Sequence, residues 1–105
     1  MDIECIMQRH PNRVPVYVRK SPTARGNLRD LEKHKYLIPR EMTMGGFMCI
    51  IRNGIEINSA QAIFVFISKK SILVPNSSTF GELYEEHKDD DKMLHLDFTS
   101  ENTFG

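Results

Sequence analysis

The 105 residues are enough for one small domain with a single hydrophobic core and too few for two. A hydrophobic share of 40% and a charged share of 27% are ordinary for a globular protein, and the longest apolar run, from Ala62 to Ile67, is too short to cross a membrane. The formal net charge is zero, which argues against a nucleic-acid binder. The charge is unevenly distributed, because residues 1–40 carry nine Lys and Arg against four Asp and Glu and are therefore basic.

The amino-terminal third predicts a short helix followed by a strand. Residues 2–9 can form two helical turns with their apolar side chains on one side. Residues 13–20 predict a strand with three valines on one face and Pro15 and Tyr17 on the other. Residues 21–29 are rich in turn formers and charge, so we expect an exposed loop there.

The middle of the chain predicts an edge strand over residues 35–39. Tyr36 and Ile38 share one face of this strand, and Leu37 lies on the other. Pro39 cannot donate a hydrogen bond to a neighbouring strand, which favours an edge position. An edge strand with apolar side chains on both faces can pair with another peptide.

The helix expected next is amphipathic and should cross the sheet. Thr43 is its expected N-cap, and Gly54 is its expected end. Apolar residues recur along it at helical spacing and form one stripe: Met44, Phe47, Met48, Ile51 and Ile55.

The second half predicts two further strands and one short helix. Residues 62–67 are apolar without alternation, as in a central strand covered on both faces, and residues 69–78 form a turn region. Thr79-x-x-Glu82 is a capping box that begins the short helix. Residues 93–99 predict the last strand, with alternate side chains inward (Leu94, Leu96 and Phe98) and outward (Met93, His95 and Asp97).

This element order predicts an α+β fold, the ubiquitin-like β-grasp. We expect a four-stranded mixed sheet with a crossing helix, preceded by a short amino-terminal helix. The expected divisions are an amino-terminal helical segment at 1–11, a β-grasp domain at 12–99 and a flexible tail at 100–105.

No pattern of residues predicts catalysis, a metal site or a cofactor. Cys49 lies among apolar neighbours without an adjacent base, so we expect a buried, inert thiol. The four histidines show no pair at metal spacing, and the acidic residues 85–91 miss the spacing of an EF-hand loop. The two cysteines form no disulfide or zinc pattern, and the chain begins without an apolar signal region, so an intracellular location is expected. We therefore predict a binding or tagging protein, not an enzyme.

The last two residues, Phe104 and Gly105, suggest a function that the element order alone does not. A terminal glycine has no Cβ, so its backbone can enter a narrow enzyme channel and its carboxylate can be attacked without obstruction. On a flexible tail that follows the last strand of a β-grasp, this glycine suggests a conjugation site.

Several motifs in this order resemble the autophagy ubiquitin-like modifiers, the group of GABARAP and microtubule-associated light chain three. The residues that carry the resemblance are His10-Pro11-Asn12-Arg13-Val14-Pro15-Val16, Lys35-Tyr36-Leu37-Ile38-Pro39, Met42-Thr43-Met44-Gly45, Leu83-Tyr84-Glu85-Glu86-His87-Lys88 and Glu101-Asn102-Thr103-Phe104-Gly105. Relatives begin with two amino-terminal helices, and this chain starts within what would be the second. Gly54 stands where relatives often carry a basic residue.

The resemblance implies conjugation through Gly105, with Phe104 in the tail that the processing enzymes recognise. A cysteine protease exposes the glycine and later removes the lipid, and an activating and a conjugating enzyme join the glycine to phosphatidylethanolamine. The implied location is the cytoplasm, and the autophagosome membrane after lipidation.

The resemblance also implies that cargo receptors and adaptors dock through short peptides with an aromatic residue, two spacers and an aliphatic residue. The implied aromatic pocket consists of Ile6, Pro15, Tyr17, Lys35, Leu37 and Met93. The implied aliphatic pocket consists of Arg13, Tyr36, Ile38, Pro39, Met42, Phe47 and Ile50. The alternative is a ubiquitin-like interaction module that is never conjugated, and nucleic-acid binding through the basic half is a poor third choice because no base-stacking motif accompanies it.

Overall fold

The computed structural model of the chain describes residues 3–24, 28–57 and 61–100. The expected conjugation residues Phe104 and Gly105, and part of the loop expected at 21–29, lie outside these ranges. The elements are α1 (Ile3–Arg9), β1 (Arg13–Lys20), β2 (Lys35–Pro39), α2 (Met44–Ile55), β3 (Phe64–Ile67), β4 (Ile72–Leu73), α3 (Phe80–His87) and β5 (Leu94–Thr99).

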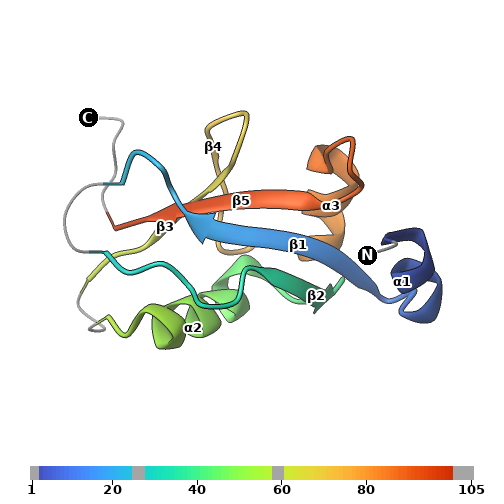
Figure 1. Cartoon of the computed structure of the whole chain (residues 1–105), viewed down its shortest axis with the longest axis horizontal. Helices are drawn as coiled ribbons and strands as arrows, with labels where there is room; N and C mark the ends of the chain where they lie inside the picture. Colours follow the sequence, from blue (N-terminus) through green and yellow to red (C-terminus); the bar gives the residue numbers. More distant parts are fainter. Residues whose placement is uncertain (1–2, 25–27, 58–60, 101–105) are drawn as a thin grey trace.

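The strands form one mixed sheet of five in the order β2-β1-β5-β3-β4, and α2 crosses one side of it (Figure 1). β1 and β5 are parallel neighbours in the middle of the sheet, whereas β2, β3 and β4 pair antiparallel with their partners. The ubiquitin-like α+β class is confirmed, and so is the edge position of β2.

The prediction of four strands was wrong. β4 lies inside the stretch expected to be only a turn region, and its two residues pair with Phe66 and Ile67 of β3. A strand of two residues is too short to show the alternation by which strands are recognised in sequence.

The core lies between the sheet and α2. The β1 valines Val14, Val16 and Val18 are all fully buried, as are Phe47 and Ile51 of α2. Each large apolar side chain buried in this way stabilises the fold by about 1.5–3 kcal/mol. The loop expected to be exposed, residues 21–29, also contributes to the core, because Leu28 is only 7% exposed and packs in it.

α2 begins as predicted but ends later. The side chain of Thr43 accepts a hydrogen bond from the Gly46 amide at 3.2 Å, which confirms the N-cap. Gly54 lies inside the helix, which runs to Ile55 and is followed by Glu56 in the left-handed conformation, with φ 55°. A Cβ atom built on Gly54 would overlap with the Cδ2 atom of the buried Leu31, so this glycine allows the helix to approach Leu31 closely.

We therefore expect Gly54→Ala to lower the free energy of unfolding by about 1 kcal/mol. Alanine is favoured over glycine in a helix by about 1 kcal/mol, but overpacking a core side chain costs about 1–3 kcal/mol. Gly46→Ala in the same helix is the control, because its Cβ would meet only ordinary contacts of 3.6 Å and should stabilise the protein. Chemical denaturation of both variants checks this, and a Gly54→Ala protein more stable than wild type would contradict it.

No helix in the described part of the chain is both long enough and apolar enough to span a membrane.

Candidate functional site

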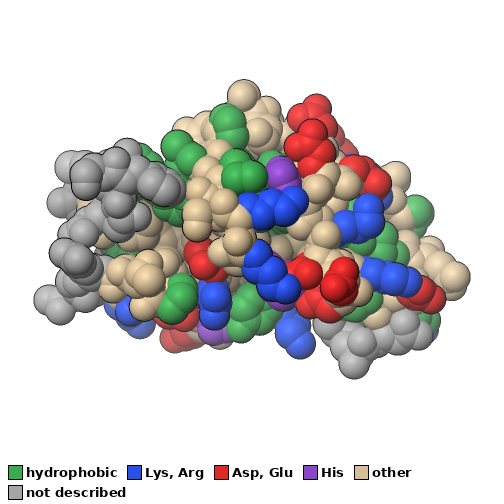
Figure 2. Space-filling model, turned by 90° about the horizontal axis from the view of Figure 1, so that it is seen from above, with side chains coloured by type: hydrophobic (Ala, Val, Ile, Leu, Met, Phe, Trp, Pro, Cys, Tyr) green, Lys and Arg blue, Asp and Glu red, His purple; other side chains and the backbone are tan. Residues whose placement is uncertain are grey.

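The side of the sheet that faces away from α2, here called the outer face, carries the candidate site. Alternation along β1 places Pro15, Tyr17 and Arg19 on this face, opposite the buried valines. The strand register sets Pro15 beside Leu37 and sets Tyr17 beside Lys35 and His95. Figure 2 shows Lys and Arg side chains intermingled with Asp and Glu side chains over this side of the molecule.

One end of the outer face holds an apolar cavity of about 390 Å³. Its walls come from α1, β1, β2 and the residues just before β5, and it is lined by Ile3, Ile6, Arg13, Pro15, Lys33, Lys35, Tyr36, Leu37 and Met93. The lining combines an apolar interior with three cationic side chains. The cavity can therefore take an apolar group that has acidic neighbours.

α1 is the wall of this cavity that is least embedded in the protein, because it has no buried residue. Met7 packs partly against the core, and its sulfur lies 3.4 Å from the hydroxyl of Tyr84. An ion pair between Glu4 and Lys92 also joins the helix to the residues before β5.

Five of the six residues assigned to the aromatic pocket line this cavity together, and Tyr17 does not. The ring of Tyr17 lies between two histidine rings, 5.5 Å from His34 and 5.6 Å from His95 between centroids. Met93 was expected on the last strand with its side chain outward; it precedes β5, lines this cavity and is only 7% exposed.

Two lining residues were missed from the sequence, Ile3 and Lys33. Ile3 shares the apolar side of α1 with Ile6, so helical spacing could have identified it. Lys33 precedes the predicted strand, so strand alternation did not include it; its ammonium group lies 5.1 Å from the centre of the Tyr36 ring.

The residues assigned to an aliphatic pocket do not all lie on one surface. Arg13 and Tyr36 line the apolar cavity instead, and Arg13 Nη1 donates a 3.1 Å hydrogen bond to the Leu37 carbonyl. Ile38 and Phe47 are in the core, 3% and 0% exposed.

Exposed surface in this set comes from Ile50, which is 40% exposed, and from the partly buried Pro39 and Met42. Tyr36 is also partly buried, with its ring edge-on to Phe47 at 5.2 Å, and burial raises its pKa.

β2 borders the cavity, and among the described strands it has a neighbour on one side only. In the strand order it stands at the end, next to β1. Backbone groups along its other side can pair with an incoming extended peptide.

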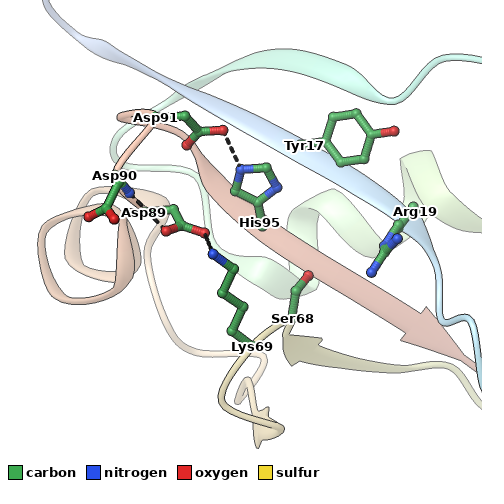
Figure 3. Close-up of a pocket in the computed structure, with 8 residues that line it drawn as sticks. All are labelled: Tyr17, Arg19, Ser68, Lys69, Asp89, Asp90, Asp91 and His95. Atoms are coloured by element: carbon green, nitrogen blue, oxygen red, sulfur yellow. Dashed lines mark hydrogen bonds and ion pairs between the residues drawn. The ribbon is translucent and has the colours of Figure 1, made fainter.

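A second, charged pocket of about 520 Å³ lies farther along the outer face (Figure 3). It is lined by Tyr17, Arg19, Ser68, Lys69, Asp89, Asp90, Asp91 and His95. Sequence reasoning did not identify this pocket, because its residues come from three separate segments of the chain.

Ion pairs connect most of its charged side chains. Lys69 Nζ lies 2.8 Å from Asp89, which lowers the pKa of Asp89 and raises the pKa of Lys69. His95 Nε2 lies 2.7 Å from Asp91 Oδ2.

Asp97 lies on the outer face and joins two side chains of this pocket, Arg19 and Ser68. Arg19 Nε and Ser68 Oγ donate to the same Asp97 oxygen, at 3.0 and 2.7 Å. Asp97 was expected to point outward, and it lies on the outer face, but it is only 8% exposed because these two side chains cover it.

Cys49 is exposed, so the expectation of a buried thiol was wrong. Within residues 3–24, 28–57 and 61–100, no group of three His, Cys, Asp or Glu side chains is arranged to hold a metal ion.

Comparisons with known proteins agree on one family. The family model described as "Autophagy protein Atg8 ubiquitin like" matches residues 1–105. Autophagy-related protein 8a of Arabidopsis thaliana is 39% identical over 100 residues, which are 95% of this chain and 79% of that protein. Autophagy-related protein 8b of the same plant is 40% identical, with the same two coverages. A crystal structure of Trypanosoma brucei ATG8 resembles this fold with a TM-score of 0.85 and 28% identity, over 99% of this chain and 86% of that chain.

Proposed function

Because this chain belongs to the Atg8 family of ubiquitin-like autophagy proteins, we propose that it is a modifier joined through Gly105 to phosphatidylethanolamine, and that it recruits partners through aromatic-x-x-aliphatic peptides. The family consists of ubiquitin-like modifiers and adaptors, not enzymes. The observation that carries the peptide part is the apolar cavity beside the edge strand β2.

In this proposal the peptide extends the sheet at β2. Its aromatic side chain enters the apolar cavity between Ile6, Pro15 and Leu37. Acidic residues beside the aromatic residue are attracted by the cations on the cavity wall, Arg13 and Lys35.

The aliphatic residue of the peptide rests on the surface beyond Tyr36. Pro39, Met42 and Ile50 offer exposed area there, whereas Ile38 and Phe47 support this surface from the core. Two apolar anchors contribute about 1.5–3 kcal/mol each, strand pairing adds to this, and ordering the peptide takes several kcal/mol back. We expect a Kd near the micromolar range, about 8 kcal/mol of binding free energy.

Conjugation would supply the membrane attachment. In the proposed cycle, a cysteine protease, an activating enzyme and a conjugating enzyme act on the tail that contains Phe104 and Gly105. The free protein would be cytoplasmic, and the lipid-linked form would sit on the autophagosome membrane.

Reconstitution tests this proposal against the alternative of an unconjugated module. The chain is incubated with the family's activating and conjugating enzymes, ATP and phosphatidylethanolamine vesicles. We expect a thioester to each enzyme and then a lipid-linked product, seen by mass spectrometry. Peptide binding without any thioester would favour the unconjugated module.

A further inference from the structure

Ser21 stands directly before Pro22, and the sequence contains no other serine or threonine followed by proline. Protein kinases of the proline-directed class select such a pair. They hold the residue after the acceptor where a backbone N–H would be left without a partner, and proline has no N–H. Ser21 is therefore the one hydroxyl residue of this chain whose sequence context fits that class of enzyme.

The Ser-Pro pair opens a surface turn that follows β1. The amide of Ala24 donates to the Ser21 carbonyl at 3.0 Å, and Pro22 and Thr23 are exposed between them. In the described part of the chain, the Ser21 hydroxyl hydrogen-bonds only with Thr23, at 3.0 Å to its hydroxyl and 3.3 Å to its amide. Transfer of a phosphate to Ser21 therefore breaks no hydrogen bond between its side chain and the core.

Ser21 also borders a small polar cavity of about 110 Å³. The lining combines one aromatic ring, one carboxylate and five hydroxyl side chains: Phe66, Asp97, Ser21, Thr23, Ser68, Ser71 and Thr99. Hydroxyl groups can donate hydrogen bonds to phosphate oxygens, so this cavity offers partners to a phosphate on Ser21. Thr99 is the last residue of β5, so the phosphate would lie beside the start of the tail expected at 100–105.

Arg19 supplies a cation for this phosphate. The Ser21 amide donates to the Phe98 carbonyl at 2.8 Å and so continues the pairing of β1 with β5, which places Arg19 and Ser21 on the outer face about 7 Å apart. Arg19 Nε lies 3.0 Å from Asp97, the carboxylate of the cavity, and neutralises it. Its terminal nitrogens have no hydrogen-bond partner among the described residues, and its side chain is 45% exposed. Because a guanidinium has several N–H donors, Arg19 can hold Asp97 through Nε and a phosphate through the terminal nitrogens.

We propose that Ser21 is the acceptor of a proline-directed protein kinase, and that Arg19 binds the phosphate that Ser21 receives. In the transfer, the Ser21 hydroxyl oxygen bonds to the γ-phosphorus of ATP, the bond from that phosphorus to the β–γ bridging oxygen breaks, and ADP leaves. The hydroxyl proton passes to the catalytic aspartate of the kinase. Phosphorylation of Ser21 requires neither the proposed peptide binding nor the proposed conjugation.

The first test incubates the full chain with ATP, Mg²⁺ and a purified cyclin-dependent kinase or, separately, a mitogen-activated kinase. We expect a singly phosphorylated product, with the phosphate located on Ser21 by fragment mass spectrometry, and no product from Ser21→Ala. Pro22→Ala should react about tenfold more slowly, because it introduces the amide N–H that these kinases leave unpaired. Ser77→Ala is the matched control and should react like the wild type, because Ser77 is exposed but is not followed by proline.

Phosphorus NMR of the phosphorylated chain tests the contact with Arg19. A phosphoserine has a second pKa of about 6, and a nearby guanidinium lowers this pKa. Arg19→Gln should therefore raise the second pKa by about 0.5, and Arg19→Lys, which keeps the charge, should raise it less. Arg40→Gln is the control and should leave the pKa unchanged, because the amide of Arg40 is bonded to the carbonyl of Asn12, at the opposite end of β1 from Ser21. Thermal unfolding of each variant checks that it is folded.

The outcomes separate the two parts of the proposal. A lack of phosphate with both kinases, phosphate on another residue, or equal rates for the wild type and Pro22→Ala would overturn Ser21 as a proline-directed site. A phosphate on Ser21 whose second pKa is the same in the wild type and in Arg19→Gln would overturn the role of Arg19 and leave the acceptor site in place.

Discussion

Replacing Gly105 by alanine should abolish thioester formation with the activating enzyme, and with it all lipid conjugation. A methyl group on the terminal residue narrows the approach to the carboxylate that must be adenylated and then attacked, and glycine is the only residue without a Cβ. The measurement is the yield of thioester and lipid-linked protein in the reconstituted reaction, resolved by intact-protein mass spectrometry.

The control for this substitution is Asn102→Ala, which changes the same tail without touching the reacting carboxylate. Gly105→Ala should leave the far-ultraviolet circular dichroism, the thermal midpoint and peptide binding unchanged, because it alters none of the described side chains that form the core and the cavity. Lipidation of Gly105→Ala at the wild-type rate would remove the conjugation proposal.

Leu37→Ala should weaken binding of an aromatic-x-x-aliphatic peptide about tenfold without unfolding the protein. The side chain of Leu37 lines the apolar cavity, and the neighbouring Ile38 holds β2 in the core. Removing part of a contacting leucine side chain costs about 1.5 kcal/mol of binding free energy, which is about tenfold in Kd. Tyr36→Ala is a less clean test, because Tyr36 also packs against Phe47.

Leu73→Ala is the matched control for this prediction. Leu73 is a leucine that is 47% exposed, but it lies on β4 at the opposite edge of the sheet. Both variants are titrated with the same peptide and unfolded in denaturant. Equal Kd values for wild type and Leu37→Ala would exclude the apolar cavity as the peptide site.

Strands and helices whose bounds are set by residues close together in the sequence were predicted well. The bounds of β1 and β2 agree with the predicted strands, because alternation and proline positions act within a few residues. Thr43 and Thr79 cap their helices as expected, since each side chain accepts a hydrogen bond from an amide three residues later. The helix α2 also buries most of its predicted stripe.

The errors concern residues whose role depends on distant parts of the chain. Gly54 suggested a helix end, but its role is to leave space for Leu31, which is 23 positions earlier in the sequence. Tyr17, which the resemblance implied for the aromatic pocket, does not line the apolar cavity, and the neighbours of its ring, His34 and His95, come from other segments of the chain. The two residues of β4 are extended because they pair with β3, and their own sequence does not predict a strand.

The amino-acid sequence by itself determined the ubiquitin-like class, the edge strand, the helix caps and most of the apolar residues that now line the cavity. These follow from hydrophobic periodicity, capping chemistry and family motifs, all of which are local in the chain. Only the tertiary structure decided which side chains share a pocket, that Ile38 and Phe47 are core residues, and that a second, charged pocket adjoins the first. Strand register and loop packing bring these residues together from positions far apart in the chain, and no local pattern encodes that arrangement.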